Sequence, residues 1–290
     1  MKNLDLSTLP AKKRKQIVSC LRAGIQLLYF LFLPSVFTAA FNGVKYIFTQ
    51  LGQGEKIEMT AFVSALLLVC AFTIVFGRFF CGFACAFGSL GDAMHAIYGI
   101  ICKKRKKKPR CIKPELAKKL ALVKYGILLL IALCCFAGVY QKARGTSPWD
   151  VFSMLHAGNF RLSSYIPGIV LLVLILVGMF FEERFFCRFL CPMGAVFSLL
   201  PILPFFTLHR KRENCIRGCS ACTRQCPSAV ELPSDGYVEI SGDCFQCQKC
   251  IDGCPKGNVT CGVGILKGNE IGFTVFKAVL LFCLFMWLGI

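Results

Sequence analysis

Acidic residues and histidines are scarce in this sequence. Its 290 residues include 15 aspartates and glutamates and 3 histidines, against 34 lysines and arginines. The apolar stretches contain almost no carboxylates, whereas an ion pump needs buried carboxylates within the membrane. The sequence also has no Ser/His/Asp arrangement, no G-x-G-x-x-G after a strand and no phosphate-binding loop. These absences argue against an ion-pumping subunit and give no indication of an autonomous nicotinamide site.

Apolar residues, in contrast, are abundant. Hydrophobic residues make up 56% of the chain and 28 residues are phenylalanine, far more than in a soluble domain of this length. Stretches long enough to cross about 30 Å of hydrocarbon lie at 22–41, 60–77, 120–140, 166–182 and 271–290. The sequence therefore predicts a mainly α-helical, multi-pass membrane protein with five spans.

Basic residues flank these stretches unevenly. The tail up to Arg22 carries 6, the loop 103–119 carries 10 and the segment between the fourth and fifth stretches carries 10, whereas the two other loops carry 5 together. Cytoplasmic flanks are the basic ones in membrane proteins. We therefore expect a bacterial-type cytoplasmic membrane location, with the N-terminus and the segment before the fifth stretch in the cytoplasm and the C-terminus outside.

The net charge of +19 is concentrated at the predicted membrane edges, as in the run Lys103–Lys108. Membrane lipids with anionic headgroups explain such a run, so nucleic acid is not expected as a partner. Lys124 and Lys277 lie near cytoplasmic ends of predicted spans, where long side chains can reach the headgroups. We expect both to do so. The N-terminal segment is predicted to stay as an anchor, because its polar part is too long for a signal peptide.

Eight of the 20 cysteines form two runs between the fourth and fifth stretches. The runs read Cys215-x3-Cys219-x2-Cys222-x3-Cys226-Pro227 and Cys244-x2-Cys247-x2-Cys250-x3-Cys254-Pro255. The second run has the bacterial ferredoxin spacing, in which three thiolates bind one [4Fe-4S] cluster and the fourth binds the neighbouring cluster. The first run has one extra residue between its first two cysteines.

This spacing predicts two [4Fe-4S] clusters whose ligands are exchanged between the runs. One cluster would use the first set, Cys215, Cys219, Cys222 and Cys254, and the other would use the second set, Cys226, Cys244, Cys247 and Cys250. Structural zinc is the alternative for four thiolates, but its Cys pairs are usually separated by a long spacer. The crowding of four cysteines into each run favours iron–sulfur clusters.

An eleven-residue block occurs twice, at a constant offset of 106 residues. It reads RFFCGFACAFG at residues 78–88 and RFFCRFLCPMG at residues 184–194. Each copy follows a pair of predicted spans, so the copies share one orientation and are expected to be related by an axis along the membrane normal. Such an axis brings four motif cysteines towards a common centre: Cys81, Cys85, Cys187 and Cys191.

The motif cysteines have two interpretations. They could bind a third, membrane-held iron–sulfur centre or act as redox thiols, or they could be small apolar residues that pack helices together. The repetition of the whole block favours ligands or redox thiols. Arg78 and Arg184, which begin the two copies, are candidates for binding such a cofactor by offsetting its negative charge. The alternative is that they anchor helix ends among headgroups.

Together these motifs resemble the NapH/NosR-type membrane polyferredoxins. The resemblance rests on two C-x3-C motifs, the second as Cys187-x3-Cys191-Pro192, followed by paired ferredoxin runs, and it extends from the first span to Pro255. The chain departs from the family pattern at Ala86, where the first motif should have proline, and in the Cys215–Cys219 spacing. The resemblance implies an electron-transfer subunit of an oxidoreductase complex, which exchanges electrons between quinone or a flavin partner and a redox enzyme.

The expected organisation follows from these features. It comprises a first membrane repeat (1–101), a basic cytoplasmic loop (102–119), a second membrane repeat (120–209), a small cytoplasmic ferredoxin-like domain with two clusters (210–262) and a C-terminal span (263–290). We expect electrons to pass between the clusters, the motif cysteines and a redox partner protein such as an acidic ferredoxin, a flavoprotein or a reductase. A second hypothesis is a metal-reducing assembly factor for a respiratory oxidase or another metalloenzyme.

Overall fold

The chain is mainly helical in its computed structural model, which describes residues 11–289 except 108, 110, 111, 113, 141–144, 161, 162, 204, 231, 233, 234, 239–241, 264 and 265. The principal helices are α1 (Ala11–Phe32), α2 (Val36–Gln53), α3 (Ala61–Phe76), α4 (Ala86–Lys104), α5 (Pro114–Leu120), α6 (Val123–Phe136), α7 (Pro148–His156), α8 (Ile166–Phe181), α9 (Pro192–Leu199) and α12 (Glu270–Trp287). Two short helices, α10 (Ala221–Arg224) and α11 (Lys249–Asp252), lie in the cysteine runs.

Each of the predicted apolar stretches is largely helical. Two helices in the described part are long and apolar enough to cross a membrane, Glu115–Phe136 and Glu270–Trp287, and there are up to three if the bent pair α1–α2 forms one span. The pair is bent by 62° between Phe32 and Val36, next to Pro34, whose ring removes a backbone donor from a helix. Helices α3 and α8 have 16 residues each. The five predicted spans thus differ in length and straightness.

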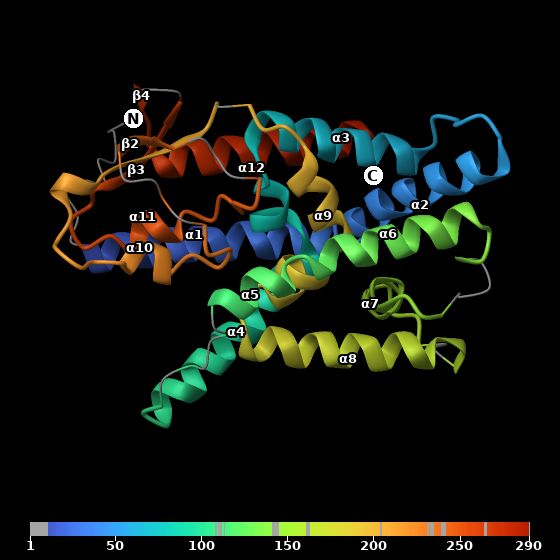
Figure 1. Ribbon diagram of the computed structural model, residues 1–290, viewed down its shortest axis with the longest axis horizontal. Helices are drawn as coiled ribbons and strands as arrows, with labels where there is room; N and C mark the ends of the chain where they lie inside the picture. The colour runs from blue at the N-terminus through green and yellow to red at the C-terminus, as the bar shows by residue number, and fades with distance from the viewer. Residues whose placement is uncertain are drawn as a thin grey trace.

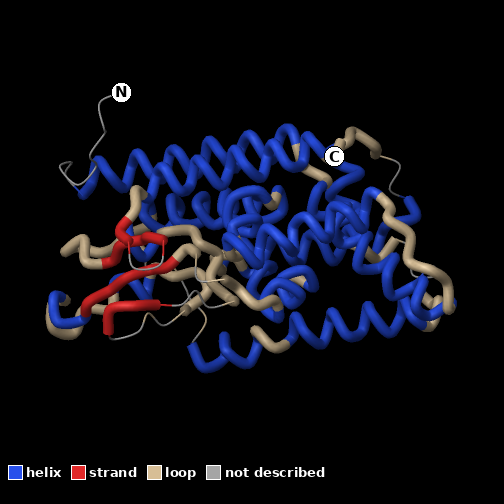
Figure 2. Tube along the Cα trace, turned by 90° about the horizontal axis from the view of Figure 1, so that it is seen from above, coloured by secondary structure: helices blue, strands red, loops and turns tan. Residues whose placement is uncertain are grey.

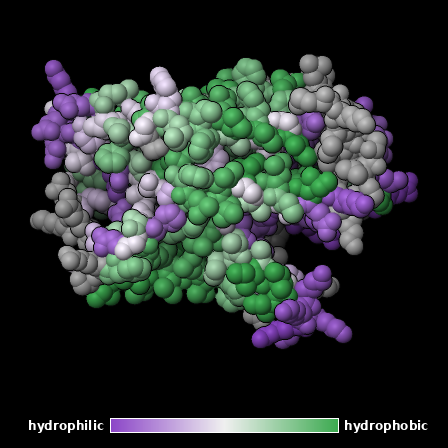
Figure 3. All heavy atoms as spheres, turned by 180° about the vertical axis from the view of Figure 1, so that it is seen from behind, coloured by the Kyte–Doolittle hydropathy of each residue, from purple (hydrophilic) through white to green (hydrophobic). Residues whose placement is uncertain are grey.

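Much of the apolar surface is exposed. Large apolar side chains on two helices are each about half exposed or more. They are Ile166, Val173, Leu174 and Val177 on α8, and Leu129, Leu130 and Leu133 on α6. Figure 3 shows apolar side chains covering the middle of one face, with polar side chains gathered towards its ends. Exposed apolar patches of this size indicate contact with a partner or a membrane.

A small antiparallel sheet lies at one end of the molecule, beside α1, α11 and α12 (Figures 1 and 2). Its strands are β1 (Thr207–Lys211), β2 (Asp235–Val238), β3 (Val259–Val263) and β4 (Leu266–Lys267), in the order β2-β1-β3-β4. Leu208 of β1 pairs with Val238 on one side and Cys261 on the other. Strand β2 ends at Val238, and Glu239 and Ile240 lie outside the described residues.

The buried residues form two apolar clusters. The larger one joins α1, α2, α3, α8 and α12 around the motif cysteines, and the smaller one lies under the sheet around Phe206, Leu208 and Ile251. Aromatic rings fill much of the larger cluster; Phe37, for example, contacts the rings of Phe41, Phe87, Trp149 and Phe186. Cysteines of the ferredoxin runs contact both clusters, so these runs lie at the boundary between the helical part and the sheet.

Candidate iron–sulfur centres

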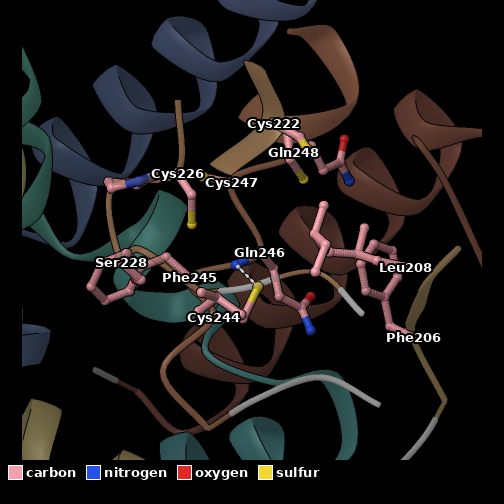
Figure 4. A pocket seen from close by; sticks show the side chains of 14 residues that line it. Phe206, Leu208, Cys222, Cys226, Ser228, Cys244, Phe245, Gln246, Cys247 and Gln248 are labelled. Atoms are coloured by element: carbon pink, nitrogen blue, oxygen red, sulfur yellow. Dashed lines mark hydrogen bonds between the residues drawn. The ribbon is translucent and has the colours of Figure 1, made fainter. Parts of the chain in front are cut away.

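The second set of cysteines surrounds a small cavity. Its four members and Cys222 line this cavity together with Phe245 and Gln246, and Cys250 lies within electrostatic range of Cys247, Cys244, Cys226 and Cys222. Figure 4 shows the sulfur atoms of Cys226 and Cys244 directed into this space. The structure therefore brings together the four cysteines that the exchanged pairing predicts for one cluster.

The backbone of this run explains how its thiols converge. Gln246 and Gln248 adopt positive φ angles of 51° and 59°, which are uncommon for residues with a side chain. The resulting tight turn ends at α11, and the Gln246 N–H donates to Cys244 Sγ at 3.4 Å (Figure 4). Burial raises the pKa of Cys244 and of Cys247 to about 11. Because a buried thiolate needs a positive partner, this donor set fits a metal cluster.

The first set is held partly by Asn258. Its side-chain nitrogen donates to Cys215 Sγ at 3.2 Å, and its backbone N–H donates to Cys254 Sγ at 3.2 Å. One residue thereby joins a cysteine of each run, as the exchanged pairing requires. Cys219, another member, is exposed. Among the residues that the structure describes, no three His, Cys, Asp or Glu side chains form a site for a single metal ion.

The two C-x3-C motifs have the same local structure. Each forms a π-helical turn, Phe80–Ala84 and Phe186–Leu190, followed by Cys85 or Cys191 as the N-cap of the next helix. The φ and ψ angles of the two capping cysteines agree within 2° (−70° and 114°; −72° and 115°). The extra residue in each turn is a π-bulge, a feature that often marks functional sites.

The structure brings the motif cysteines together. All four are at most 6% exposed, and Cys191 lies within electrostatic range of Cys187, Cys81 and Cys85. The N–H of Gly194 donates to Cys191 Sγ at 3.2 Å, at the positive end of α9. The four buried thiols therefore lie within electrostatic range of one another, as the repeat predicted.

Arg78 and Arg184 are not headgroup anchors, because they are 1% and 3% exposed. Arg184 donates to the carbonyl oxygens of Cys81 and Gly82, and it pairs with Asp92 of α4 through an Nε–Oδ1 bond of 2.7 Å. Arg184, which begins the second copy of the block, therefore contacts the backbone of the first copy. The alternative that placed these arginines among lipids is wrong.

Arg78 joins the motif to the ferredoxin run. Its Nη1 donates to Ser198 Oγ at 3.1 Å, to the Gly242 carbonyl at 3.2 Å and to Asp243 at 3.3 Å. Its Nε and Nη2 are buried without a hydrogen-bond partner in the described part of the chain. Nη2 lies 3.0 Å from the place that a Cβ on Gly194 would occupy. Since Arg78 also lies within electrostatic range of Cys187, its unpaired donors fit an anionic cluster at the motif cysteines.

Lys124 and Lys277 do not reach the headgroups as predicted. They are 3% and 1% exposed. Lys124 Nζ donates to Asp243 at 2.7 Å, and Lys277 Nζ donates to Gln246 Oε1 at 2.7 Å. The prediction was wrong because α6 and α12 begin next to the second cysteine run, whose polar groups take the place of the headgroups.

The ion pairs at Asp243 and Asp92 hold these carboxylates in the charged form. Burial alone would raise the pKa of Asp243, but Lys124 and Arg78 hold it below its ordinary value. Burial likewise acts to raise the pKa of Asp92, and the charge of Arg184 lowers it. The Asp243 side chain is half exposed, so water screens its pairs more than that of Asp92, which is 16% exposed.

Comparison with known proteins decides the family. A family model described as a 4Fe-4S binding domain matches residues 59–109 and 166–207, and these two segments contain the two C-x3-C motifs. The uncharacterized protein MJ0749 of Methanocaldococcus jannaschii is 30% identical over 206 residues, which are 70% of this chain and 71% of that protein. The ferredoxin-type protein NapH of Haemophilus influenzae is 25% identical over 67% of this chain and 65% of its own length.

The chain belongs to the NapH/NosR-type membrane polyferredoxins. The regulatory protein NosR of Pseudomonas aeruginosa is also similar, at 24% identity over 68% of this chain and 27% of NosR. No solved structure matches the chain significantly. As a member of this polyferredoxin family, the protein is a membrane iron–sulfur protein associated with electron transfer. These relatives do not favour the assembly-factor hypothesis.

Proposed function

We propose that this polyferredoxin is a one-electron relay with three [4Fe-4S] clusters, held by the first set, the second set and the motif cysteines. When bound, each cluster accepts or releases one electron, and the protein adjusts its potential through burial, charge and hydrogen bonds to sulfur. The ligands of the first two clusters are assigned from the ferredoxin spacing. The hydrogen bonds of Asn258 support the first set, and the cavity lined by the second set supports the other. The third is supported by four buried thiols and the unpaired donors of Arg78.

One contact carries the proposal. Phe245 lies between Cys244 and Cys247 of the second set, and its carbonyl oxygen lies against Gly82, the residue after Cys81. A Cβ on Gly82 would be less than 3.0 Å from that oxygen. The loop that holds one cluster therefore touches the turn that holds the next centre. Such proximity is what a relay between the second set and the motif cysteines requires.

The first set marks the outer end of the relay. Cys219 and Ile216 are exposed, as are Lys211, Arg212 and Arg217 nearby. A basic rim around an exposed cluster would attract an acidic ferredoxin, flavoprotein or reductase by electrostatic steering. At the other end, quinone or a partner-bound flavin would exchange electrons with the motif centre.

The proposed membrane arrangement has five spans and two tandem repeats, 1–101 and 120–209. The basic loop (102–119) and the ferredoxin-like domain (210–262) lie in the cytoplasm with the N-terminus, and the span in 263–290 places the C-terminus outside. The distribution of basic residues supports this orientation. The exposed apolar faces of α6 and α8 support their contact with lipid.

The test is the iron and acid-labile sulfide content of the anaerobically purified protein. We expect about 12 irons per chain in the wild type, four per cluster, and about 8 in a Cys81→Ser/Cys187→Ser variant. Cys283→Ser is the matched control, because Cys283 is exposed on α12 and should leave the iron content unchanged. About 8 irons in both the wild type and the double variant would rule out a cluster at the motif cysteines.

A further inference from the structure

The loop Asp243–Gln248, which we call the docking loop, is fastened to the helical part at almost every residue. Asp243 accepts from Lys124 and Arg78, Gln246 accepts from Lys277, and Gln248 donates to Thr274 at 3.0 Å. The carbonyl oxygen of Cys247 accepts from Arg22. Two ligands of the second set are therefore held in a constant position relative to the C-x3-C motifs.

Phe245 lies against two arginines at the centre of this loop. Its ring centroid is 5.0 Å from the Cζ atom of Arg78 and 5.7 Å from that of Arg184. The ring is 3% exposed, so both contacts are shielded from water, where cation–π attraction is strongest. The two guanidinium groups come from different copies of the repeated block and meet at the same side chain.

Each arginine also faces cysteines of both centres. Arg184 donates to the Cys81 carbonyl and lies within electrostatic range of Cys187 and Cys247. Arg78 lies within electrostatic range of Cys187 and Cys244. One charge therefore acts on a motif cysteine and on a second-set cysteine at once.

We propose that Arg78 and Arg184 are shared counter-charges, which stabilise the reduced form of both the motif centre and the second-set cluster. This inference rests on the proposed third cluster. An added electron makes a thiolate-bound cluster more negative, and a nearby cation in a medium of low dielectric constant favours that state. Because the same two cations act on both centres, the two potentials are raised together. A common shift makes both centres easier to reduce and leaves the free-energy difference between them unchanged.

The local charge balance makes Arg78 the better residue to change. Asp243 is paired with both Arg78 and Lys124, so it keeps a cationic partner when Arg78 is removed. Asp92, in contrast, forms its ion pair with Arg184, and removing Arg184 alone would leave a buried carboxylate without that charge. Replacing both members of that pair keeps the local net charge constant.

The experiment is an anaerobic redox titration of the full-length protein, followed by EPR of each cluster. In Arg78→Gln, the midpoint potentials of the motif centre and the second-set cluster should both fall by about 59 mV or more, a tenfold change in the one-electron equilibrium. The first-set cluster should not move. Arg78→Lys keeps the positive charge and should bring both potentials most of the way back to their wild-type values. The double variant Arg184→Gln/Asp92→Asn should change either potential less than Arg78→Gln does.

Arg210→Gln is the matched control. Arg210 is another buried arginine, and its Nη1 lies 3.5 Å from Cys222 Sγ of the first set, so this variant should lower the first-set potential most and leave the potential of the motif centre unchanged. If the midpoint potential of only one of the two centres, or of neither, changes in Arg78→Gln, the inference is overturned. The relay itself would still stand in that case, provided that three clusters titrate. Only two titrating clusters in the wild type would overturn the relay and the inference together.

Discussion

A Gly82→Ala variant is expected to detach the docking loop from the first C-x3-C motif. The added Cβ would lie less than 3.0 Å from the Phe245 carbonyl oxygen, a backbone atom that cannot rotate aside as a flexible side chain can. Either the loop or the π-helical turn must shift, and overpacking of this kind costs about 1–3 kcal/mol. We also expect slower electron transfer between the second set and the motif centre, because their separation increases.

Hydrogen exchange of the docking-loop amides, measured by mass spectrometry, is the direct test. Exchange in residues 243–248 should rise in Gly82→Ala, and the thermal midpoint should fall. Gly99→Ala is the matched control, because Gly99 is also helical and a Cβ added there would have no neighbouring atom within 4 Å. Alanine there should raise stability by up to about 1 kcal/mol. Identical exchange in the two variants would show that Gly82 is not a close-contact position.

An Asp92→Ala variant is expected to be less stable than the wild type by about 3–5 kcal/mol, the usual cost of removing one partner of a buried ion pair. Asp92 accepts from Arg184 Nε at 2.7 Å and from Gln26 at 2.7 Å. With Asp92 removed, Arg184 keeps its charge at 3% exposure. Thermal unfolding in detergent measures the loss, and Glu55→Ala, at an exposed residue, should show none. Equal midpoints for Asp92→Ala and wild type would contradict the pairing.

The stability difference should depend on pH in a defined direction. Burial acts to raise the pKa of Asp92, but Arg184 lowers it overall. A carboxyl group with a lowered pKa contributes its full stability above its ordinary value of about 3.9. That contribution is lost as the pH falls through the lowered value. The gap between wild type and Asp92→Ala should therefore stay constant from pH 7 to 5 and narrow only below about pH 4.

Local sequence spacing predicted which cysteines lie near one another. The C-x2-C-x2-C-x3-C-P spacing depends on one tight turn, so Cys244, Cys247 and Cys250 could be placed around one cavity without knowledge of the fold. The constant 106-residue offset predicted the convergence of Cys81, Cys85, Cys187 and Cys191, which the structure shows. Their role as ligands stays a prediction.

Polar residues near the span ends were harder to place. Lys124 and Lys277 resemble ordinary residues that reach the headgroups, since nothing near them in the chain is acidic. Their partners, Asp243 and Gln246, are 119 and 31 residues away. The bend next to Pro34 could have been anticipated from proline alone, whereas the π-helical turns have no signal in the spacing.

The sequence by itself determined that this is a membrane iron–sulfur protein, because apolar content, charge distribution and cysteine spacing are local properties of the chain. Only the tertiary structure decided that the second cysteine run rests on the C-x3-C motifs, with Phe245 against Arg78 and Arg184. That contact joins residues 61 to 167 positions apart. It depends on how α1, α6 and α12 pack around the docking loop, and long-range packing of this kind leaves no periodic pattern in a single sequence.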